Sequence, residues 1–390
     1  MLSCPWINLL VPRTIFLLLF AASASGQLTP AEKKLNLDSF EKVWSTVRDR
    51  HPDPALNGLD WKAVHDSTLP RIAGAESADE VRTVLREMLY KLGASHYSII
   101  PSDRYLPSAP APTPTPTPAP TPAPASSPAA APAAEAGQPP AAGGGTRLEV
   151  ASALLTPAPA AATAVPESGA RNGETDVKIV RFANLPEQRI YFQSRKLPGG
   201  AGYIRFNEFL DPVSIIPKVE AALHGFARAP GIVIDLRGNP GGIGLMAMGV
   251  AGFFISEEGH LLGTMVLRDA TLKFMVFPRP EIYSGPLAVL VDGGSASTAE
   301  IFAQGMQDLG RARIFGQKTA GAALPSDIIR LPNGDGFQYA QASYTSFKGR
   351  VLEGNGVVPD VEIPSAAGAA PAEHDAVLEA AEAWIAGLRK

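Results

Sequence analysis

The chain has 390 residues, of which 37 are proline and 37 are glycine, and its formal net charge is −4. At roughly 100–200 residues per domain, this length predicts two or three domains. The mild negative charge argues against a broad nucleic-acid-binding surface, so we expect no nucleic-acid partner. Cys4 is the only cysteine, which excludes an intramolecular disulfide and a cysteine-rich metal site. We expect no metal and no cofactor.

The N-terminal residues 1–26 have the pattern of a signal peptide. Arg13 precedes an apolar run over 14–22, and the small residues 23–26 follow it. The run is shorter than the roughly 20 residues of a comfortable membrane span. We therefore expect an exported protein, periplasmic or extracellular, that starts near Gln27 and has no stable membrane insertion. An uncleaved anchor is the alternative.

Residues 37–101 are predicted to form an N-terminal helical subdomain. Phe40, Val43 and Val47 recur at helical spacing, and Asp60 is placed to cap a second helix. Further apolar residues at helical spacing predict a third helix, which Gly93 would end. A short strand over 95–100 should follow.

Residues 102–175 are predicted to form a Pro/Ala-rich linker. The segment 101–170 holds 17 of the 37 prolines, mixed with alanine, threonine and then glycine. Such a composition cannot bury enough apolar surface to fold, so we expect an extended chain that is dispensable for folding.

Residues 176–390 alternate between strand-like and helix-like patterns, which predicts an α/β core with largely buried strands. The strand-like runs are 177–182, 189–192, 202–206, 231–236, 264–267, 273–277, 287–291 and 312–315. The helical stretches are 213–228, 241–255, 298–309 and 374–388. A turn over 331–336 predicts a hairpin. Ligands in such folds bind at the carboxyl ends of the strands.

Two glycine-rich turns follow predicted strands. The turn that ends at Gly241 and Gly242 could direct backbone N–H groups at an anion, although it could equally be a tight turn with no ligand. The turn over 292–297 places Ser297 at a helix N-terminus, where developing negative charge is stabilised. Ser297 and Glu300 also fit a capping box, so a purely structural role is the alternative.

Two further motifs supply a possible base and acid. Ser95 and His96 follow the N-terminal helices, and histidine is the usual base for a serine nucleophile. Glu353 precedes a glycine-rich loop and could orient that histidine. A structural histidine and an exposed loop acid are the alternatives.

Taken in order, the motifs Gly231–Gly242, Ser295–Glu300 and Gly354–Asp360 resemble those of the C-terminal-processing (tail-specific) serine peptidases, family S41. The resemblance covers about 37–101 and 176–365. It implies a crotonase-like ββα-spiral core behind the helical subdomain. The nucleophile then corresponds to Ser297 and not to Ser295.

The base distinguishes two branches of this family. The best-known members use a Ser–Lys pair, with the lysine directly after a Thr-x-Gly turn, but here Thr319-Ala320-Gly321 is followed by Ala322. The chain is closer to the branch that resembles the tricorn protease core, which uses Ser, His, Glu and a second Ser. The residues that match this set are Ser297, His96, Glu353 and Ser95, with the N–H groups of Gly241 or Gly242 and of Thr298 as the oxyanion hole. Lys318 precedes the turn and is expected at the surface.

The resemblance implies a serine endopeptidase whose partner is a polypeptide, cleaved as a peptide or an unfolded protein. Most tail-specific proteases carry a PDZ domain between the helices and the core, and we find no PDZ-like strand series here. Recognition of substrate C-termini is therefore not implied. A histidine base predicts activity that rises with pH through a pKa of about 6–7. The alternatives are a non-catalytic binder of a hydrophobic ligand, as in the family's retinoid-carrying relatives, and an esterase or lactamase-like hydrolase.

Overall fold

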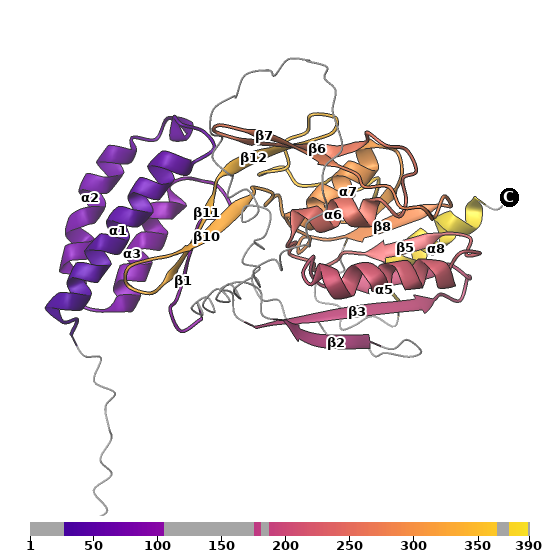
Figure 1. Ribbon diagram of the computed structural model, residues 1–390, viewed down its shortest axis with the longest axis horizontal. Coiled ribbons are helices and arrows are strands. Elements are labelled where there is room, and N and C mark those ends of the chain that lie inside the picture. Colours follow the sequence, from indigo (N-terminus) through magenta and orange to yellow (C-terminus); the bar gives the residue numbers. More distant parts are fainter. Residues whose placement is uncertain (1–26, 105–174, 181–186, 365–373, 389–390) are drawn as a thin grey trace, which may run out of the picture.

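The computed structural model of the chain describes residues 27–104, 175–180, 187–364 and 374–388 (Figure 1). The predicted signal peptide and most of the predicted linker lie outside the described residues. The described chain is mixed α/β with helices at its N-terminal end, which confirms the predicted fold class.

Three helices open the described chain, with a short 3-10 turn between the first two. Their bounds are α1 Pro30–Arg50, η1 Leu56–Gly58, α2 Trp61–Gly74 and α3 Ala78–Tyr90. Asp60 caps α2 as predicted, because its carboxylate accepts a hydrogen bond from the Ala63 N–H at 2.9 Å. Each helix buries one face against the other two, since isolated helices of this length are marginal in water.

A small sheet from both ends of the sequence completes this helical unit. It consists of β1 Ser98–Ile100, β11 Gly336–Ala340 and β10 Ser326–Arg330, in that spatial order. The turn predicted over 331–336 does join β10 to β11, and its Asp335 is buried and forms an ion pair with Arg82 of α3. Phe337 lies in the same hydrophobic cluster as the three helices. The hairpin thus ties the C-terminal half of the chain to the N-terminal helices.

The core is a sheet in the order β13-β9-β8-β5-β4-β3-β2. Its strands are β2 Thr175–Val180, β3 Gln188–Lys196, β4 Gly202–Phe206, β5 Ile232–Asp235, β8 Leu287–Val291, β9 Arg313–Gly316 and β13 Val361–Glu362. The strands from β4 to β13 run parallel, and β3 and β2 are antiparallel to their neighbours. Every residue of β5 and β8 is buried, as expected for central strands covered on both faces.

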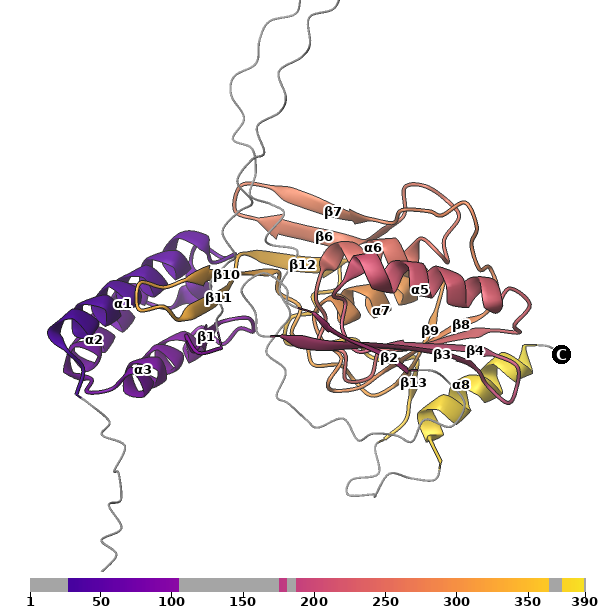
Figure 2. The same ribbon diagram turned by 60° about the horizontal axis from the view of Figure 1, so that its bottom comes forward.

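Helices cover both faces of this sheet. Figure 2 shows α5 Pro212–Gly225, α6 Gly244–Ala251 and α7 Thr298–Asp308 on one side and α8 Ala376–Gly387 on the other. A third sheet, made of β12 Ala342–Ser346, β6 Leu261–Leu267 and β7 Thr271–Met275, packs beside α7. The helix predicted over 241–255 is shorter than expected, because Gly241 and Gly242 have positive φ angles that a right-handed helix cannot contain.

Candidate active site

The two glycine-rich turns lie side by side because β5 and β8 are neighbouring parallel strands, whose carboxyl ends share one edge of the sheet. Hydrogen bonds join the turns directly. The Gly238 N–H donates to the Asp292 carboxylate at 2.8 Å, and the Ala296 N–H donates to the Asn239 carbonyl at 2.9 Å. Two turns that are 54 residues apart in sequence are therefore packed against each other.

Ser297 is held in a strained turn at the start of α7. Its φ of 53° and ψ of −118° lie in a region that side-chain-bearing residues rarely adopt, and the residue is 7% exposed. A nucleophilic serine commonly sits on such a strand-to-helix turn. Ser295 is different, since it is fully buried and its hydroxyl donates to the Leu236 carbonyl at 2.8 Å. This geometry favours Ser297 as the reactive serine of the pair.

Gly241 and Gly242 lie against the Ser297 turn and cannot be replaced by larger residues. A Cβ atom on Gly241 would lie 2.7 Å from the Ser297 Cβ, and one on Gly242 would lie 2.4 Å from the Phe209 carbonyl oxygen. The Gly241 N–H already donates to the Asn239 side chain at 2.9 Å. Among the described residues, the N–H groups of Gly242 and Thr298 have no hydrogen-bond acceptor, so these two are the ones free to bind an oxyanion.

Glu300 binds the backbone around Ser297 through several hydrogen bonds. Its buried carboxylate accepts hydrogen bonds from four donors: the N–H groups of Ser297, Gly321 and Ala322 and the hydroxyl of Thr319. Burial raises the pKa of Glu300, while these hydrogen bonds favour its ionised form. The capping interaction expected for Glu300 is therefore present. The same carboxylate also binds the Thr319–Gly321 turn to the start of α7.

Ser95 joins Glu353 to His96. The Glu353 carboxylate accepts from the Ser95 N–H at 2.7 Å and from the Ser95 hydroxyl at 2.9 Å. The same hydroxyl oxygen lies 2.6 Å from Nδ1 of His96. Glu353 thus contacts the histidine through Ser95 and not directly, which differs from the direct contact that an orienting acid suggests.

His96 is enclosed, with 3% of its surface exposed and a φ of 63°. Its Nε2 atom is buried and has no hydrogen-bond partner among the described residues. Burial alone lowers the pKa of His96 to about 4, below the value of about 6–7 expected from the sequence. The imidazole is therefore neutral across the physiological pH range and can accept a proton.

Two consecutive alanines connect the serine turn to the acid. The Ala322 carbonyl accepts from the Ser297 N–H at 2.9 Å, and the next N–H, that of Ala323, donates to the Glu353 carboxylate at 3.0 Å. Ala322 occupies the position that corresponds, by the resemblance given above, to the lysine of the Ser–Lys branch. Its backbone and that of Ala323 link Ser297 to Glu353. In the described part of the chain, no hydrogen bond joins the Ser297 hydroxyl to His96. Lys318 is exposed, as expected.

A partly buried ion cluster lies at the start of the first glycine-rich turn. Arg237 forms ion pairs with Asp235 at the end of β5 and with Asp375 before α8, both through Nη2 at 2.6 and 2.7 Å. The Tyr203 hydroxyl donates to Asp235 at 2.7 Å. Sequence reasoning missed Asn239 and Arg237 as positioning residues, although both stand inside the motif that it selected.

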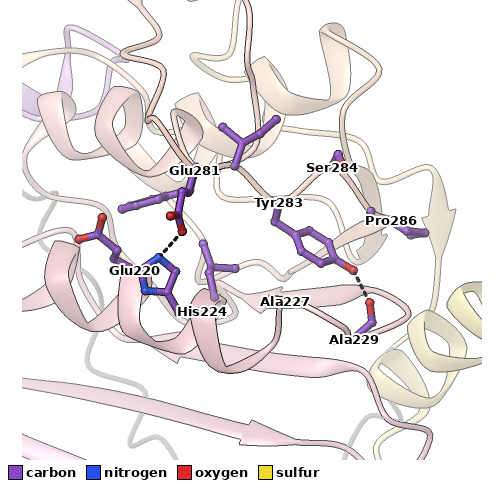
Figure 3. Close-up of a pocket in the computed structure, with 12 residues that line it drawn as sticks. Glu220, His224, Ala227, Ala229, Glu281, Tyr283, Ser284 and Pro286 are labelled. Atoms are coloured by element: carbon purple, nitrogen blue, oxygen red, sulfur yellow. Dashed lines mark hydrogen bonds and ion pairs between the residues drawn. The ribbon is translucent and has the colours of Figure 1, made fainter.

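A separate pocket of about 330 Å³ lies between α5 and the segment before β8 (Figure 3). His224 and Glu281 form an ion pair at 2.9 Å at its mouth, and the Tyr283 hydroxyl donates to the Ala229 carbonyl at 2.8 Å. None of the residues predicted for the active site lines it. The described residues contain no group of three or more metal-binding side chains and no helix long and apolar enough to cross a membrane.

Two family models match separate parts of the chain. Residues 200–363 match peptidase family S41, and residues 36–90 match the tricorn protease C1 domain. The carboxyl-terminal-processing proteases of Picosynechococcus sp. and Synechocystis sp. are 30% and 32% identical over 165 and 166 residues, each covering 42% of this chain. This chain spans only 39% and 38% of those relatives.

A solved structure shows the same fold over most of the chain. The crystal structure of mature CPAF superposes with a TM-score of 0.53 at 12% identity, covering 86% of this chain and 93% of that one. Together with the S41 match, this confirms the predicted mixed α/β fold behind N-terminal helices. Residues 200–363 therefore match the peptidase family S41 model, and the chain is similar to the carboxyl-terminal-processing proteases over 42% of its length.

Proposed function

We propose that the protein is an exported serine endopeptidase that cleaves peptides or unfolded proteins by acyl transfer. Ser297 is the nucleophile, His96 the base, and Ser95 and Glu353 orient the base. The observation that carries this proposal is the continuous set of contacts from Glu353 through Ser95 to a neutral, enclosed His96, together with the backbone bridge at Ala322 and Ala323 that joins Glu353 to the strained turn of Ser297.

The hydrogen bonds fix which nitrogen of His96 carries the proton. A carboxylate only accepts, so the single hydroxyl hydrogen of Ser95 is used on Glu353. Nδ1 of His96 must then donate to the Ser95 oxygen. In a neutral imidazole the other nitrogen, Nε2, carries the lone pair, and this is the atom that has no partner among the described residues.

The reaction follows from this tautomer. Nε2 of His96 takes the Ser297 proton as the hydroxyl oxygen attacks the substrate carbonyl carbon. The N–H groups of Gly242 and Thr298 stabilise the oxyanion, and His96 then returns the proton to the leaving amine. Water, activated by the same nitrogen, hydrolyses the acyl-enzyme. Ser95 and Glu353 stabilise the imidazolium that forms in between.

Active-site labelling tests this proposal. A fluorophosphonate probe should label the wild-type protein at Ser297, and the protein should digest denatured casein. Ser297→Ala should lose both properties, while Ser45→Ala, a change at a half-buried serine of α1, should keep both. If the folded wild-type protein neither takes the label nor digests casein, it is a non-catalytic binder.

Export is a separate part of the proposal and rests on the sequence of residues 1–26. N-terminal sequencing of protein from the exported fraction should give a start near Gln27. Recovery of intact Met1 from the cytosol would contradict it.

A further inference from the structure

Glu208 lies at the same sheet edge as the proposed active site. It follows β4, which is parallel to β5 and pairs with it, and β5 pairs in turn with β8. The carboxyl ends of these three strands carry, in spatial order, the Glu208 segment, the Gly241–Gly242 turn and the Ser297 turn. Substrate-binding groups in parallel sheets gather at this edge.

Backbone contacts connect Glu208 to the Ser297 turn within a few residues. The next residue, Phe209, donates its N–H to the Gly241 carbonyl and accepts from the Ile243 N–H, both at 2.7 Å. Gly241 in turn lies against Ser297. Glu208 therefore directly precedes Phe209, the residue that forms a bridge to Gly242 of the proposed oxyanion hole.

The side chain of Glu208 is largely buried, its carboxylate oxygens keep some contact with solvent, and it has no protein partner among the described residues. The residue is 9% exposed, and no hydrogen bond or ion pair involves its side chain among the described residues. Two other buried acids of this chain are paired with cations, Asp235 with Arg237 and Asp335 with Arg82, and buried Glu300 accepts four hydrogen bonds. Glu208 is thus a carboxylate for which the described protein supplies no cation.

Its electrostatic surroundings contain no charge that would offset this burial. Desolvation raises the pKa of Glu208 to about 7, and no charged group on β3, β4, α5 or the Gly238–Ile243 turn contributes to it. The nearest acid along the chain, Asp211, is already paired with Lys178 at 2.7 Å. A ligand that brings its own positive charge would lower the energy of the ionised carboxylate.

We propose that Glu208 determines substrate specificity: its carboxylate binds the ammonium or guanidinium group of a lysine or arginine side chain in the peptide substrate, close to the bond that is cleaved. The proposal rests on the peptidase function proposed above. A buried, unpaired carboxylate discriminates strongly, because an uncharged side chain leaves it without a partner.

The test uses paired substrates and a conservative variant. Cleavage sites in denatured casein, mapped by mass spectrometry, should show lysine or arginine enriched at one position. In a peptide cut at such a site, replacing arginine with its neutral isostere citrulline should lower kcat/KM by about ten- to a hundredfold for the wild type. Glu208→Gln should abolish this difference, whereas Glu220→Gln, at an exposed acid of α5, should keep it.

The outcomes separate this inference from the proposed function. Absence of any hydrolysis by the wild type would remove the peptidase proposal itself. Hydrolysis without a basic preference, or the same preference in Glu208→Gln, would overturn the role of Glu208 while the peptidase stands.

A second measurement needs no variant and covers the case in which Glu208→Gln fails to fold. The ratio of kcat/KM for the arginine and citrulline peptides should fall as the pH is lowered from 8 to 6 on the wild type, because Glu208 becomes protonated. Taking the ratio cancels the titration of the catalytic base. A ratio that does not change over this range would overturn the proposal.

Discussion

Glu353 and Ser95 contact each other twice across 258 positions of sequence, through the N–H and the hydroxyl of Ser95. Ser95 belongs to the N-terminal helical unit and Glu353 to the core. Because His96 follows Ser95 directly, this double contact also fixes the orientation of the imidazole relative to the core. The proposed active site therefore depends on how the two parts of the chain dock.

The Ser297 and Ser295 hydroxyls should respond differently to removal. Ser297→Ala should lower casein hydrolysis by several orders of magnitude and change the free energy of unfolding by about 1 kcal/mol at most. Ser295→Ala removes the fully buried Ser295 hydroxyl, leaves the half-buried Asp292 N–H, which donates to it at 3.0 Å, without an acceptor, and should cost about 1–3 kcal/mol. Hydrolysis assays and thermal melts check both. Normal cleavage by Ser297→Ala would show that the nucleophile is misassigned.

The Ser95 hydroxyl should matter for kcat more than for KM. Ser95→Ala removes the acceptor of the His96 Nδ1 proton and should lower kcat by about 10- to 1,000-fold, whereas Ser95→Thr keeps a hydroxyl and should retain most activity. Ser98→Ala is the control, because this nearby hydroxyl contacts Gln338 and not the site. Steady-state kinetics on one peptide measures all three. Wild-type kcat in Ser95→Ala would argue against the relay from Glu353.

The identity of the base can be tested by comparing His96 with Lys318. His96→Ala should lower kcat by several orders of magnitude, and Lys318→Ala should be nearly silent because that side chain is exposed. The acidic limb of the kcat/KM profile should lie well below pH 6, since only neutral imidazole accepts a proton and burial lowers the pKa of His96 to about 4. Loss of activity in Lys318→Ala with an active His96→Ala would instead place the enzyme with the Ser–Lys members.

Acid should destabilise the fold through His96. Its pKa is about 4 in the folded protein, against about 6.5 in an unfolded chain, so the unfolded state binds more protons between these values. The stability is complete above about pH 6.5 and should fall by about 1–3 kcal/mol as the pH drops towards 4. In urea melts across this range, His96→Gln should flatten the slope and His224→Gln, at an exposed histidine, should not.

The ion pairs of Arg237 with Asp235 and Asp375 should contribute more to the free energy of unfolding than to the rate of hydrolysis. Arg237→Met leaves the fully buried Asp235 with its Tyr203 and Arg205 contacts and the backbone N–H of residue 237, but without its guanidinium partner, and should cost about 3 kcal/mol. Arg228→Met, at an exposed arginine without such contacts, should fall within about 0.5 kcal/mol of wild type. Chemical denaturation at pH 7 measures the difference. Equal stability of the two variants would contradict a supporting role for the cluster.

Local features of this protein follow from its sequence because they depend on neighbouring residues. The apolar spacing of α3, the cap at Asp60 and the hairpin turn before β11 are confirmed, since helix periodicity, capping and turn chemistry act over a few residues. The contact between the two glycine-rich turns was not predicted, because it depends on the pairing of the non-consecutive strands β5 and β8. The predicted start of the helix at residue 241 was wrong, because α6 begins at Gly244. The positive φ angles at Gly241 and Gly242 depend on contacts with Phe209 and Ser297, which are distant in sequence.

The mixed α/β class, the motifs and the candidates Ser297, His96 and Glu353 can be predicted from the amino-acid sequence. Three features could not be predicted without the packed chain: Ser95 stands between Glu353 and His96, the β10–β11 hairpin packs with the N-terminal helices, and Glu208 has no protein partner among the described residues. All three have a common cause. Burial and long-range hydrogen bonds depend on which distant segments pack together, and a pKa depends on that packing and on the charges it brings near.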